Sequence, residues 1–272
     1  MKIIAWNVQG CGNPFTQNHL NQLISIDKPG ILFLSETKYQ KHLVKYLLKD
    51  YPNTHIVDPI GLTGGLDLAW VDGFSFEIVQ WNINMINVLG QPNSESKKWL
   101  LTCFYGSPYL SNRNIAWDFL TKISEQIDKQ FFPWILLGDL NMIFSQEEKL
   151  GGLPFKKSGC EHYHNILSNA GILDIGFKGY EFTWNNHREG STNIQERLDI
   201  VVVNAEWNIQ FPKAELSHFV AAGSDYISAT LSLDTSYIKL EYTFKFYDTC
   251  QKESSCVQTI KDTWFDALGI TQ

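Results

Sequence analysis

The chain has 272 residues, 44% of them hydrophobic and 19% charged, which suits one large globular domain or two small ones with a substantial core. Its formal net charge of −7 argues against tight, charge-driven binding of nucleic acid, because such proteins usually carry a basic footprint. No apolar run approaches the roughly 18 residues of a membrane span, and Met1–Asn7 is too short and too polar for a signal peptide. We therefore expect a nuclear or cytoplasmic protein without membrane contact.

The five cysteines are scattered and show no CxxC spacing, so reduced thiols are expected. They are Cys11, Cys103, Cys160, Cys250 and Cys256. For the close group Cys160, His162 and His164, the two alternatives are a helix surface and a metal site. No second ligand pair stands at zinc spacing, which favours the helix surface.

The first half of the chain alternates strands with helices and then becomes rich in β-structure. Apolar and β-branched runs predict strands over residues 2–8, 31–34, 56–57, 64–71, 74–81 and 99–104. Leucine and isoleucine at helical spacing predict helices over 18–26 and 41–48. The dipeptide Asp72-Gly73 between two of the strands predicts a hairpin.

The second half continues in the same way. The pattern predicts helices over 114–127 and 159–170, and strands over 134–137, 182–184, 197–203 and 227–233. Hairpins mixed with β-α-β stretches predict an α/β (α+β) sandwich with helices outside paired sheets. From about residue 234 the sequence is different, with only a weakly amphipathic helical stretch. We therefore divide the chain into a domain at 1–233 and a tail at 234–272.

The strand at 134–137 is followed by a pair of polar residues. Gly138 ends the apolar run, and Asp139 and Asn141 stand two residues apart after it. In an extended backbone, residues i and i+2 point to the same side, so a carboxylate and a carboxamide are presented together at the end of a buried element. The alternative is an Asx turn that only closes the strand.

The same pattern recurs at other strand ends. Polar side chains close or follow apolar runs at Asn7, Glu36, Tyr105, Asp139 with Asn141, Asp199, and Ser224 with Asp225. Buried carboxylates are costly unless they are paired or bind a cation, so several at strand ends suggest a hard-cation site. Mg²⁺ prefers oxygen ligands and combines one or two carboxylates with water and phosphate oxygens. A metal with positioned donors is what phosphodiester cleavage requires. For each residue taken singly, a strand cap or turn is the alternative.

Seven motifs resemble, in their order, those of the endonuclease/exonuclease/phosphatase superfamily. They are 6–10, Ser35-Glu36-Thr37, Phe104-Tyr105-Gly106, 138–141, Phe182-Thr183-Trp184, Arg197-Leu198-Asp199 and Ser224-Asp225. Further motifs resemble more closely the apurinic-type endonuclease domain of plant LINE (non-LTR) retrotransposon polyproteins: Gly64-Gly65-Leu66, 99–102, 148–152 and Phe211-Pro212. The resemblance covers about residues 1–233. The tail is similar to the segment that joins this nuclease to a reverse transcriptase.

The resemblance implies a four-layer α/β sandwich, in which two facing mixed β-sheets are flanked by helices. It also implies hydrolysis of DNA that depends on Mg²⁺ or Mn²⁺. Glu36 would bind the metal, with Asn7 and Asp225 nearby. Asp139 would orient or deprotonate the attacking water.

The remaining site residues are assigned by the same resemblance. Asn141 and Tyr105 would stabilise the charged transition state. Thr183, Ser224 and Asn141 would face the substrate. Asp199 would pair with a histidine that directly follows the Ser-Asp motif.

That histidine is replaced here, because the motif is Ser224-Asp225-Tyr226. Histidine titrates near pH 6.5 and tyrosine near pH 10, so Tyr226 can donate a hydrogen bond but cannot become a cation. Loss of a general acid–base group costs roughly 10²–10⁴-fold in rate. We therefore expect weakened activity with Tyr226 at the catalytic position. His218, upstream of the motif, is the first candidate to replace the imidazole, and a loop or core histidine is the alternative.

Three functions are compatible with the sequence. The first is a Mg²⁺-dependent DNA endonuclease weakened by Tyr226, and the second is a non-catalytic remnant that keeps the fold and weak nucleic-acid binding. The third is a phosphatase of the same fold that acts on a small phosphoester or a lipid headgroup. The LINE-like motifs favour the first two. We expect a monomer that binds DNA weakly, mostly without specificity and in a salt-sensitive way, because phosphate contacts dominate.

Overall fold

A computed structural model describes residues 1–39, 47–61, 63–91, 97–127, 132–220 and 227–233. The chain divides into two compact units, Met1–Thr235 and Ser236–Gln272, and all described residues lie in the first. Most of the helix predicted at 41–48 and the whole tail therefore lie outside the described residues. None of the helices in the described ranges has the length and apolar character that crossing a bilayer requires.

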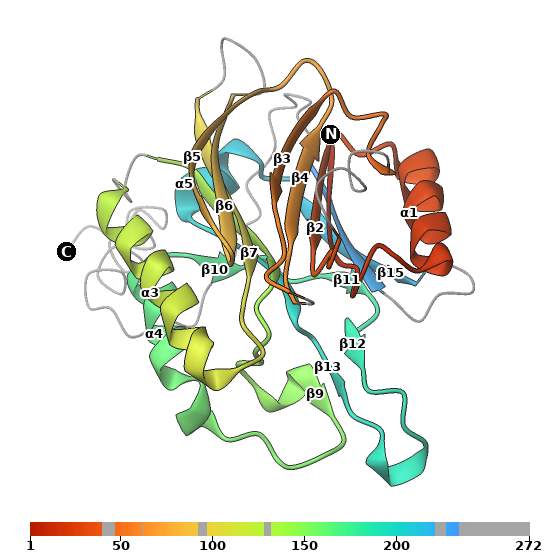
Figure 1. Ribbon diagram of the computed structural model, residues 1–272. Coiled ribbons are helices and arrows are strands. Elements are labelled where there is room, and N and C mark those ends of the chain that lie inside the picture. Colours follow the sequence, from red (N-terminus) through yellow and green to blue (C-terminus); the bar gives the residue numbers. More distant parts are fainter. Residues whose placement is uncertain (40–46, 62, 92–96, 128–131, 221–226, 234–272) are drawn as a thin grey trace, which may run out of the picture. The chain divides into compact units, whose positions relative to one another are not determined.

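Two large mixed sheets form the centre of the first unit (Figure 1). The seven-stranded sheet has the order β11 (Lys178–Gly179), β15 (Glu215–Val220), β16 (Ile227–Ser232), β1 (Lys2–Asn7), β2 (Ile31–Ser35), β4 (Leu66–Trp70) and β3 (Asn53–Val57). The six-stranded sheet has the order β10 (Leu173–Asp174), β14 (Asp199–Val203), β8 (Trp134–Asp139), β7 (Trp99–Tyr105), β6 (Met85–Gln91) and β5 (Ser75–Asn82). A small third sheet joins β12 (Trp184–Asn185), β13 (Gln195–Glu196) and β9 (Lys149–Leu150).

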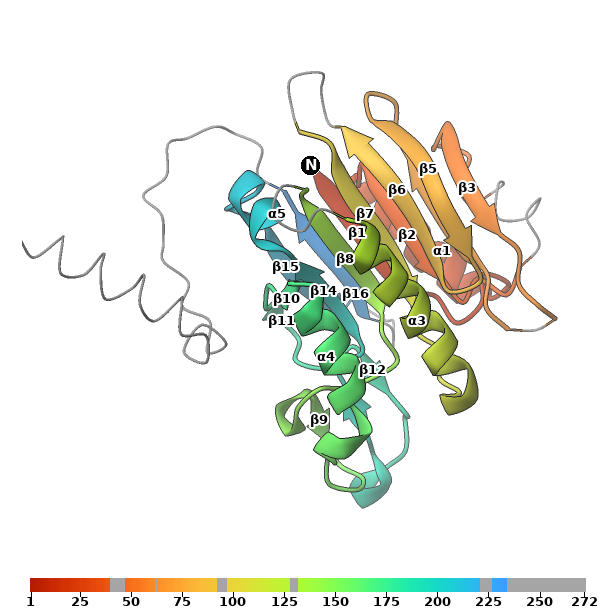
Figure 2. The same cartoon turned by 90° about the vertical axis from the view of Figure 1, so that its left-hand side faces the viewer.

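Helices cover the outer faces of both large sheets. α1 (Pro14–Asp27) packs on the seven-stranded sheet, whereas α3 (Leu110–Gln126) and α4 (Glu161–Asn169) pack on the six-stranded sheet (Figure 2). The short α5 (Ala205–Gln210) follows β14. The layers are therefore helix, sheet, sheet and helix, and the predicted four-layer α/β sandwich is confirmed.

The central strands are apolar on both sides because both of their faces are covered. In β8, Ile135 and Leu137 belong to the core between the two sheets, while Trp134 and Leu136 belong to the core under α3 and α4. Burial on both faces explains why the run is continuously apolar instead of alternating. Because β8 lies inside the six-stranded sheet, the residues at its end occupy a fixed place.

The prediction of a hairpin at Asp72-Gly73 is wrong. β4 pairs with β2 and β3, whereas β5 pairs with β6 in the other sheet. Both edges of β4 are occupied, so the next strand cannot pair beside it, and the turn carries the chain from one sheet to the other. The hairpin lies instead between β5 and β6, where Asn82 Oδ1 accepts hydrogen bonds from the backbone N–H groups of Asn84 at 2.7 Å and Met85 at 3.1 Å.

Other elements differ from the prediction in extent or were not expected. α3 begins at Leu110, and the strand predicted at 182–184 is the two-residue β12. β6 and β15 have no predicted counterpart. Their apolar runs are interrupted by polar residues, Asn87 in β6 and His218 in β15, which are nevertheless buried. Packing against neighbouring strands therefore overrides the local pattern.

Candidate active site

Strand ends from both large sheets bring polar side chains together at one edge of the sandwich. Tyr105, Asp139 and Asp199 are direct partners across the neighbouring strands β7, β8 and β14. Asn7 ends β1, and Glu36 directly follows β2, which runs parallel to β1. The structure thus brings together residues from five strands that the sequence predicted for one site.

Glu36 is the acceptor at the centre of this cluster. Tyr105 donates its hydroxyl to Glu36 Oε1 at 2.5 Å, Asn7 Nδ2 reaches the same oxygen at 3.5 Å, and Lys38 Nζ lies 2.8 Å from Oε2. Burial alone would raise the pKa of Glu36, but the bonds from Lys38 and Tyr105 and the charge of Lys38 lower it below its ordinary value. Glu36 is therefore ionised at neutral pH. Burial and the bond to Glu36 raise the pKa of Tyr105, which stays a neutral donor.

Asp139 is almost inaccessible, with 3% of its surface exposed. Asn7 Nδ2 donates to Asp139 Oδ2 at 2.7 Å, and Asn141 donates to both oxygens, from its backbone N–H at 2.7 Å and from Nδ2 at 3.1 Å. Burial raises the pKa of Asp139 to about 6, although the bonds from Asn7 and Asn141 oppose the shift. The backbone bond from Asn141 is the Asx turn offered above as the alternative. The turn and the polar cluster therefore coexist.

Asp199 forms a second buried carboxyl group beside Asp139. Burial, and then the negative charge of Asp139, raise the pKa of Asp199 well above its ordinary value, while a hydrogen bond from Thr183 opposes the shift. Thr183 Oγ1 also accepts the backbone N–H groups of Leu198 and Asp199, each at 3.0 Å. Two neighbouring buried carboxylates repel each other, so we expect the pair to share one proton near neutral pH.

The backbone at the site adopts left-handed conformations that are rare outside glycine. The φ angle is 53° at Glu36 and 50° at Asn141. Gly138 has a φ of 133°, and a Cβ there would lie 2.1 Å from the carbonyl oxygen of Phe104. Glycine therefore allows β8 to approach β7 closely where both strands end. Such conformations persist where the surrounding structure holds them, and they cluster at functional sites.

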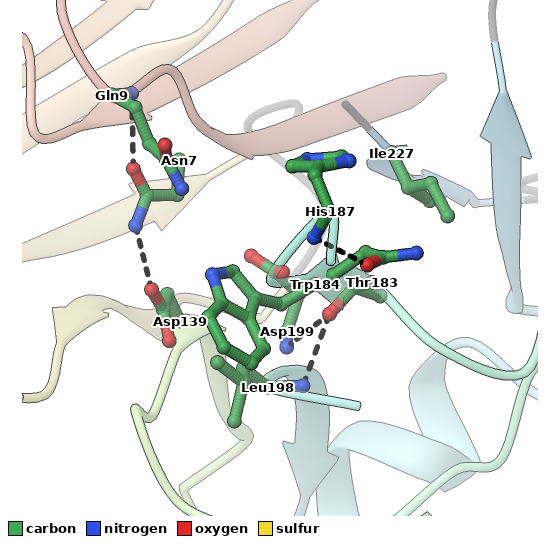
Figure 3. A pocket seen from close by; sticks show the side chains of 10 residues that line it. Asn7, Gln9, Asp139, Thr183, Trp184, His187, Leu198, Asp199 and Ile227 are labelled. Atoms are coloured by element: carbon green, nitrogen blue, oxygen red, sulfur yellow. Dashed lines mark hydrogen bonds between the residues drawn. The ribbon is translucent and has the colours of Figure 1, made fainter. Parts of the chain in front are cut away.

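A small cavity opens beside the carboxyl groups (Figure 3). Its volume is about 20 Å³, which is room for about one water molecule. The residues that line it include Asn7, Asp139, Asp199, Trp184, His187 and Ile227. A larger hollow of about 510 Å³ shares Trp184, His187 and Ile227 with the cavity and adds Tyr180 and Phe182. The small cavity beside the carboxyl groups therefore shares part of its wall with the larger hollow.

Three predicted site residues lie outside the described part of the chain, namely Ser224, Asp225 and Tyr226. The roles assigned to them stay predictions. His218, the first candidate to replace the missing imidazole, is buried on β15. Its Nδ1 lies 2.9 Å from the carbonyl oxygen of Tyr180, and its ring stacks on Phe177 with 4.7 Å between the ring centroids. His218 is therefore a core histidine, and burial lowers its pKa.

His187 is among the cavity residues that the sequence did not predict as site residues. It follows β12 in the loop that leads to β13. Loop residues have no apolar periodicity, so their position relative to the strand ends cannot be inferred from pattern. The available signal is the place of His187 between the Phe182-Thr183-Trp184 and Arg197-Leu198-Asp199 motifs, both of which contribute to the site.

The group Cys160, His162 and His164 lies where α4 begins. Cys160 is buried with its Sγ 3.3 Å from the carbonyl oxygen of Lys157, whereas both histidines are exposed. In the ranges that the structure describes, no group of three or more His, Cys, Asp and Glu side chains is arranged to hold a metal ion. Asp225, which the resemblance places near the metal, is outside those ranges.

Similar folds occur in several solved nucleases of low sequence identity. The endonuclease domain of TRAS1, a telomere-specific non-LTR retrotransposon, has a TM-score of 0.61 at 12% identity, with 85% of this chain and 97% of that chain covered. The 3'-5' exonuclease NExo from Neisseria meningitidis has a TM-score of 0.62 at 16% identity, covering 86% and 100%. The AP endonuclease LMAP from Leishmania major has a TM-score of 0.67 at 16% identity, covering 85% and 86%. These similarities establish the fold.

Family membership rests on the sequence itself. No curated protein matches the chain. The model of the Endonuclease/Exonuclease/phosphatase family matches residues 4–225, a span that contains Asn7, Glu36, Tyr105, Asp139 and Asp199. The match covers most of the chain and confirms the resemblance inferred from the motifs. The chain belongs to the Endonuclease/Exonuclease/phosphatase family.

Proposed function

We propose that this protein is a divalent-metal-dependent phosphodiesterase that cleaves DNA. The observation that carries the proposal is the hydrogen-bonded series Tyr105, Glu36, Asn7, Asp139 and Asn141. Strand caps bond to residues close in sequence, whereas these bonds join residues 29, 69 and 132 positions apart. Strand ends of both sheets are therefore tied together, and Asn7 and Asp139 of this series line the small cavity.

The donor set fits Mg²⁺ or Mn²⁺, which prefer oxygen ligands. Glu36 is ionised, and its Oε2 pairs with the Lys38 ammonium, so this position favours a positive charge. Glu36 is the candidate ligand, with Asn7 and Asp225 as its neighbours. When bound, the metal would neutralise charge on the phosphate oxygens and lower the pKa of water.

Asp139 is the candidate proton acceptor for the attacking water. With a pKa of about 6 it is mostly ionised at pH 7, and it lines a cavity with room for about one water molecule. The bonds from Asn7 and Asn141 hold its two oxygens in place. Tyr105 and Asn141 are neutral donors, so they would stabilise a charged transition state without adding repulsion.

The larger hollow supports a nucleic-acid substrate. It is lined by Tyr180, Phe182 and Trp184, and Tyr180 is 57% exposed. A base stacked on an aromatic side chain gains about 1–3 kcal/mol, and every base has a face to stack. With 22 Lys and Arg against 29 Asp and Glu, the chain has no overall positive charge that would attract phosphates. Weak binding with little sequence preference follows from both features.

The substitution Glu36→Gln tests this function. Wild-type protein should nick supercoiled plasmid slowly, and only with Mg²⁺ or Mn²⁺. Glu36→Gln should lose nicking and metal binding, measured by calorimetric titration, and should stay folded because glutamine keeps the shape of the side chain. Glu147→Gln, at an exposed carboxylate in a short 3-10 turn, is the matched control and should behave like wild type.

Three outcomes would contradict the proposal in different ways. Equal metal affinity in wild type and Glu36→Gln would remove Glu36 from the metal site. Metal binding without nicking by the wild type would favour the non-catalytic remnant. Release of phosphate from an inositol phosphate, with plasmid left intact, would favour a phosphatase of the same fold.

A further inference from the structure

The loop between β12 and β13 carries a histidine on the wall of the active-site cavity. His187 lines both the small cavity and the larger hollow, as does Ile227, the first residue of β16. Figure 3 shows the imidazole ring on the same side of the cavity as the Ile227 side chain. Ile227 directly follows Tyr226, where the Ser-Asp motif lacks its histidine. An imidazole from another strand pair therefore lies on the same side of the cavity as the residue that follows that position.

Side-chain hydrogen bonds hold this loop in a defined conformation. Asn185 Oδ1 accepts the backbone N–H of His187 at 2.7 Å and Nδ2 of Asn193 at 2.9 Å. Asn186 Oδ1 accepts the backbone N–H of Ile194 at 3.0 Å. His187 has a φ of 55°, a left-handed conformation that is uncommon for a residue with a side chain. Residues held in this way are frequent at functional sites.

The other described histidines are engaged elsewhere. They are His19 and His55, each packed against a tryptophan, His162 and His164 on α4, and the core residue His218. Within the ranges that the structure describes, His187 is therefore the one histidine on the wall of the cavity. It is exposed, so a substrate can reach it.

We propose that His187 contacts the phosphate of the substrate and supplies the imidazole that is missing at Tyr226. The inference rests on the proposed function, because it places a phosphodiester in the cavity. The imidazole donates one N–H to a non-bridging phosphate oxygen and keeps its proton throughout the reaction. Donors of this kind stabilise the charge that develops in the transition state.

The first test is the nicking of supercoiled plasmid by His187→Ala in the presence of Mg²⁺. Removing one such donor typically lowers kcat about 10²–10³-fold, and we expect a loss of this size. His187→Arg, which keeps an N–H donor at this position, should retain more activity than His187→Ala. His162→Ala removes an exposed histidine of α4 and is the matched control. If wild type nicks and His187→Ala nicks within about twofold of it, the role of His187 is refuted while the proposed function stands.

The second test restores the family histidine with Tyr226→His. If His187 occupies the role of the missing group, His187→Ala should cost much less in the Tyr226→His background than in the wild-type background. An equal cost in both backgrounds would show that the two positions do not serve the same phosphate. An inert wild type with an active Tyr226→His variant would overturn the inference, because His187 would not have replaced the missing imidazole, and the natural chain would then be the non-catalytic remnant.

If no variant nicks DNA, the proposed function fails. A binding measurement then tests the contact between His187 and DNA. Protein labelled with ¹⁵N-histidine is titrated with a short DNA duplex, and the imidazole signals are assigned by their loss in His187→Ala and His162→Ala. We expect the His187 signals to shift and those of His162 to stay in place. Unshifted His187 signals on a duplex that does bind, or no binding at all, would refute the contact.

Discussion

The site has two walls that are held in place by different means. We call them the strand-end wall, with Glu36 and Asp139, and the loop wall, with His187 and Trp184. Glu36 and Asp139 lie at strand ends of the large sheets. Burial raises the pKa of Asp139, whereas Lys38 and bonds from distant strands lower the pKa of Glu36 in spite of burial. His187 and Trp184 lie on the small third sheet and its loop, where short-range bonds from asparagine side chains hold the backbone. Burial shifts the pKa of a carboxyl group, whereas a side chain that meets a large substrate has to be accessible.

This difference predicts that the walls respond differently to mutation. The strand ends share their packing with the core of the sandwich, so damage there should reach the stability of the whole domain. The loop shares few buried contacts with the core, so damage there should stay local. Three substitutions, taken from the largest expected effect to the smallest, test whether the walls are independent.

Gly138→Ala should destabilise the domain most. The new Cβ would lie 2.1 Å from the Phe104 carbonyl oxygen, and φ at this position is 133°. Because overpacking and backbone strain act together, the unfolding free energy should fall by about 4 kcal/mol. Gly73→Ala is the matched control, because its φ of 99° is also positive but no atom lies within 4 Å. It should lose only about 1 kcal/mol. Urea unfolding measures the loss of unfolding free energy in both variants. Equal losses would mean that β7 and β8 can move apart at Gly138 without further cost in stability.

Asp139→Asn should change how stability depends on pH. The pKa of Asp139 is about 6 in the folded protein against 3.8 ordinarily, so between these values the folded state binds more protons than the unfolded chain. Its contribution is fully present below about pH 4 and lost as pH rises through about 6. The loss is about 3 kcal/mol for about two pKa units. Relative to wild type, Asp139→Asn should therefore gain about 3 kcal/mol between about pH 4 and pH 7.

Urea unfolding without divalent metal at both pH values measures this difference. Asp118→Asn, which alters an exposed carboxylate on α3, is the control for the general effect of charge removal. A constant difference between wild type and Asp139→Asn across the pH range would show that Asp139 ionises as easily as a free carboxylate. Burial at the strand ends would then leave the pKa of Asp139 at its ordinary value.

Asn185→Ala should have the smallest effect on stability. It removes two hydrogen bonds in a solvent-accessible loop, worth about 1 kcal/mol or less in unfolding free energy. The amide of His187 should exchange its hydrogen faster, while the amides of β8 keep their protection. Asn165→Ala on the exposed side of α4 is the control. A loss as large as that of Gly138→Ala would show that the two walls are one cooperative unit.

Local sequence predicted most of the strand-end wall. Short apolar runs that are bounded by strand-breaking residues predict buried strands. The polar residues that directly follow such runs, such as Glu36 and Asp139, must therefore lie at the strand ends. The motifs also predicted the family and the four-layer sandwich, which are confirmed. The helix predicted at 41–48, the tail, and Tyr226 with its two preceding residues lie largely or wholly outside the described residues, so the predictions about them stay predictions.

Register and connectivity were decided by the tertiary structure. The turn at Asp72-Gly73 has the local chemistry of a hairpin, but β4 has no free edge, so the chain crosses to the other sheet. The alignment of Tyr105, Asp139 and Asp199 depends on pairing between strands far apart in sequence.

The position of His187 was also decided by the fold, because a loop has no periodicity that reports what it faces. The sequence by itself determined which residues stand at the ends of buried strands, since that depends on local apolar pattern. Only the packed sheets decided which of these residues meet, and which histidine lies beside them.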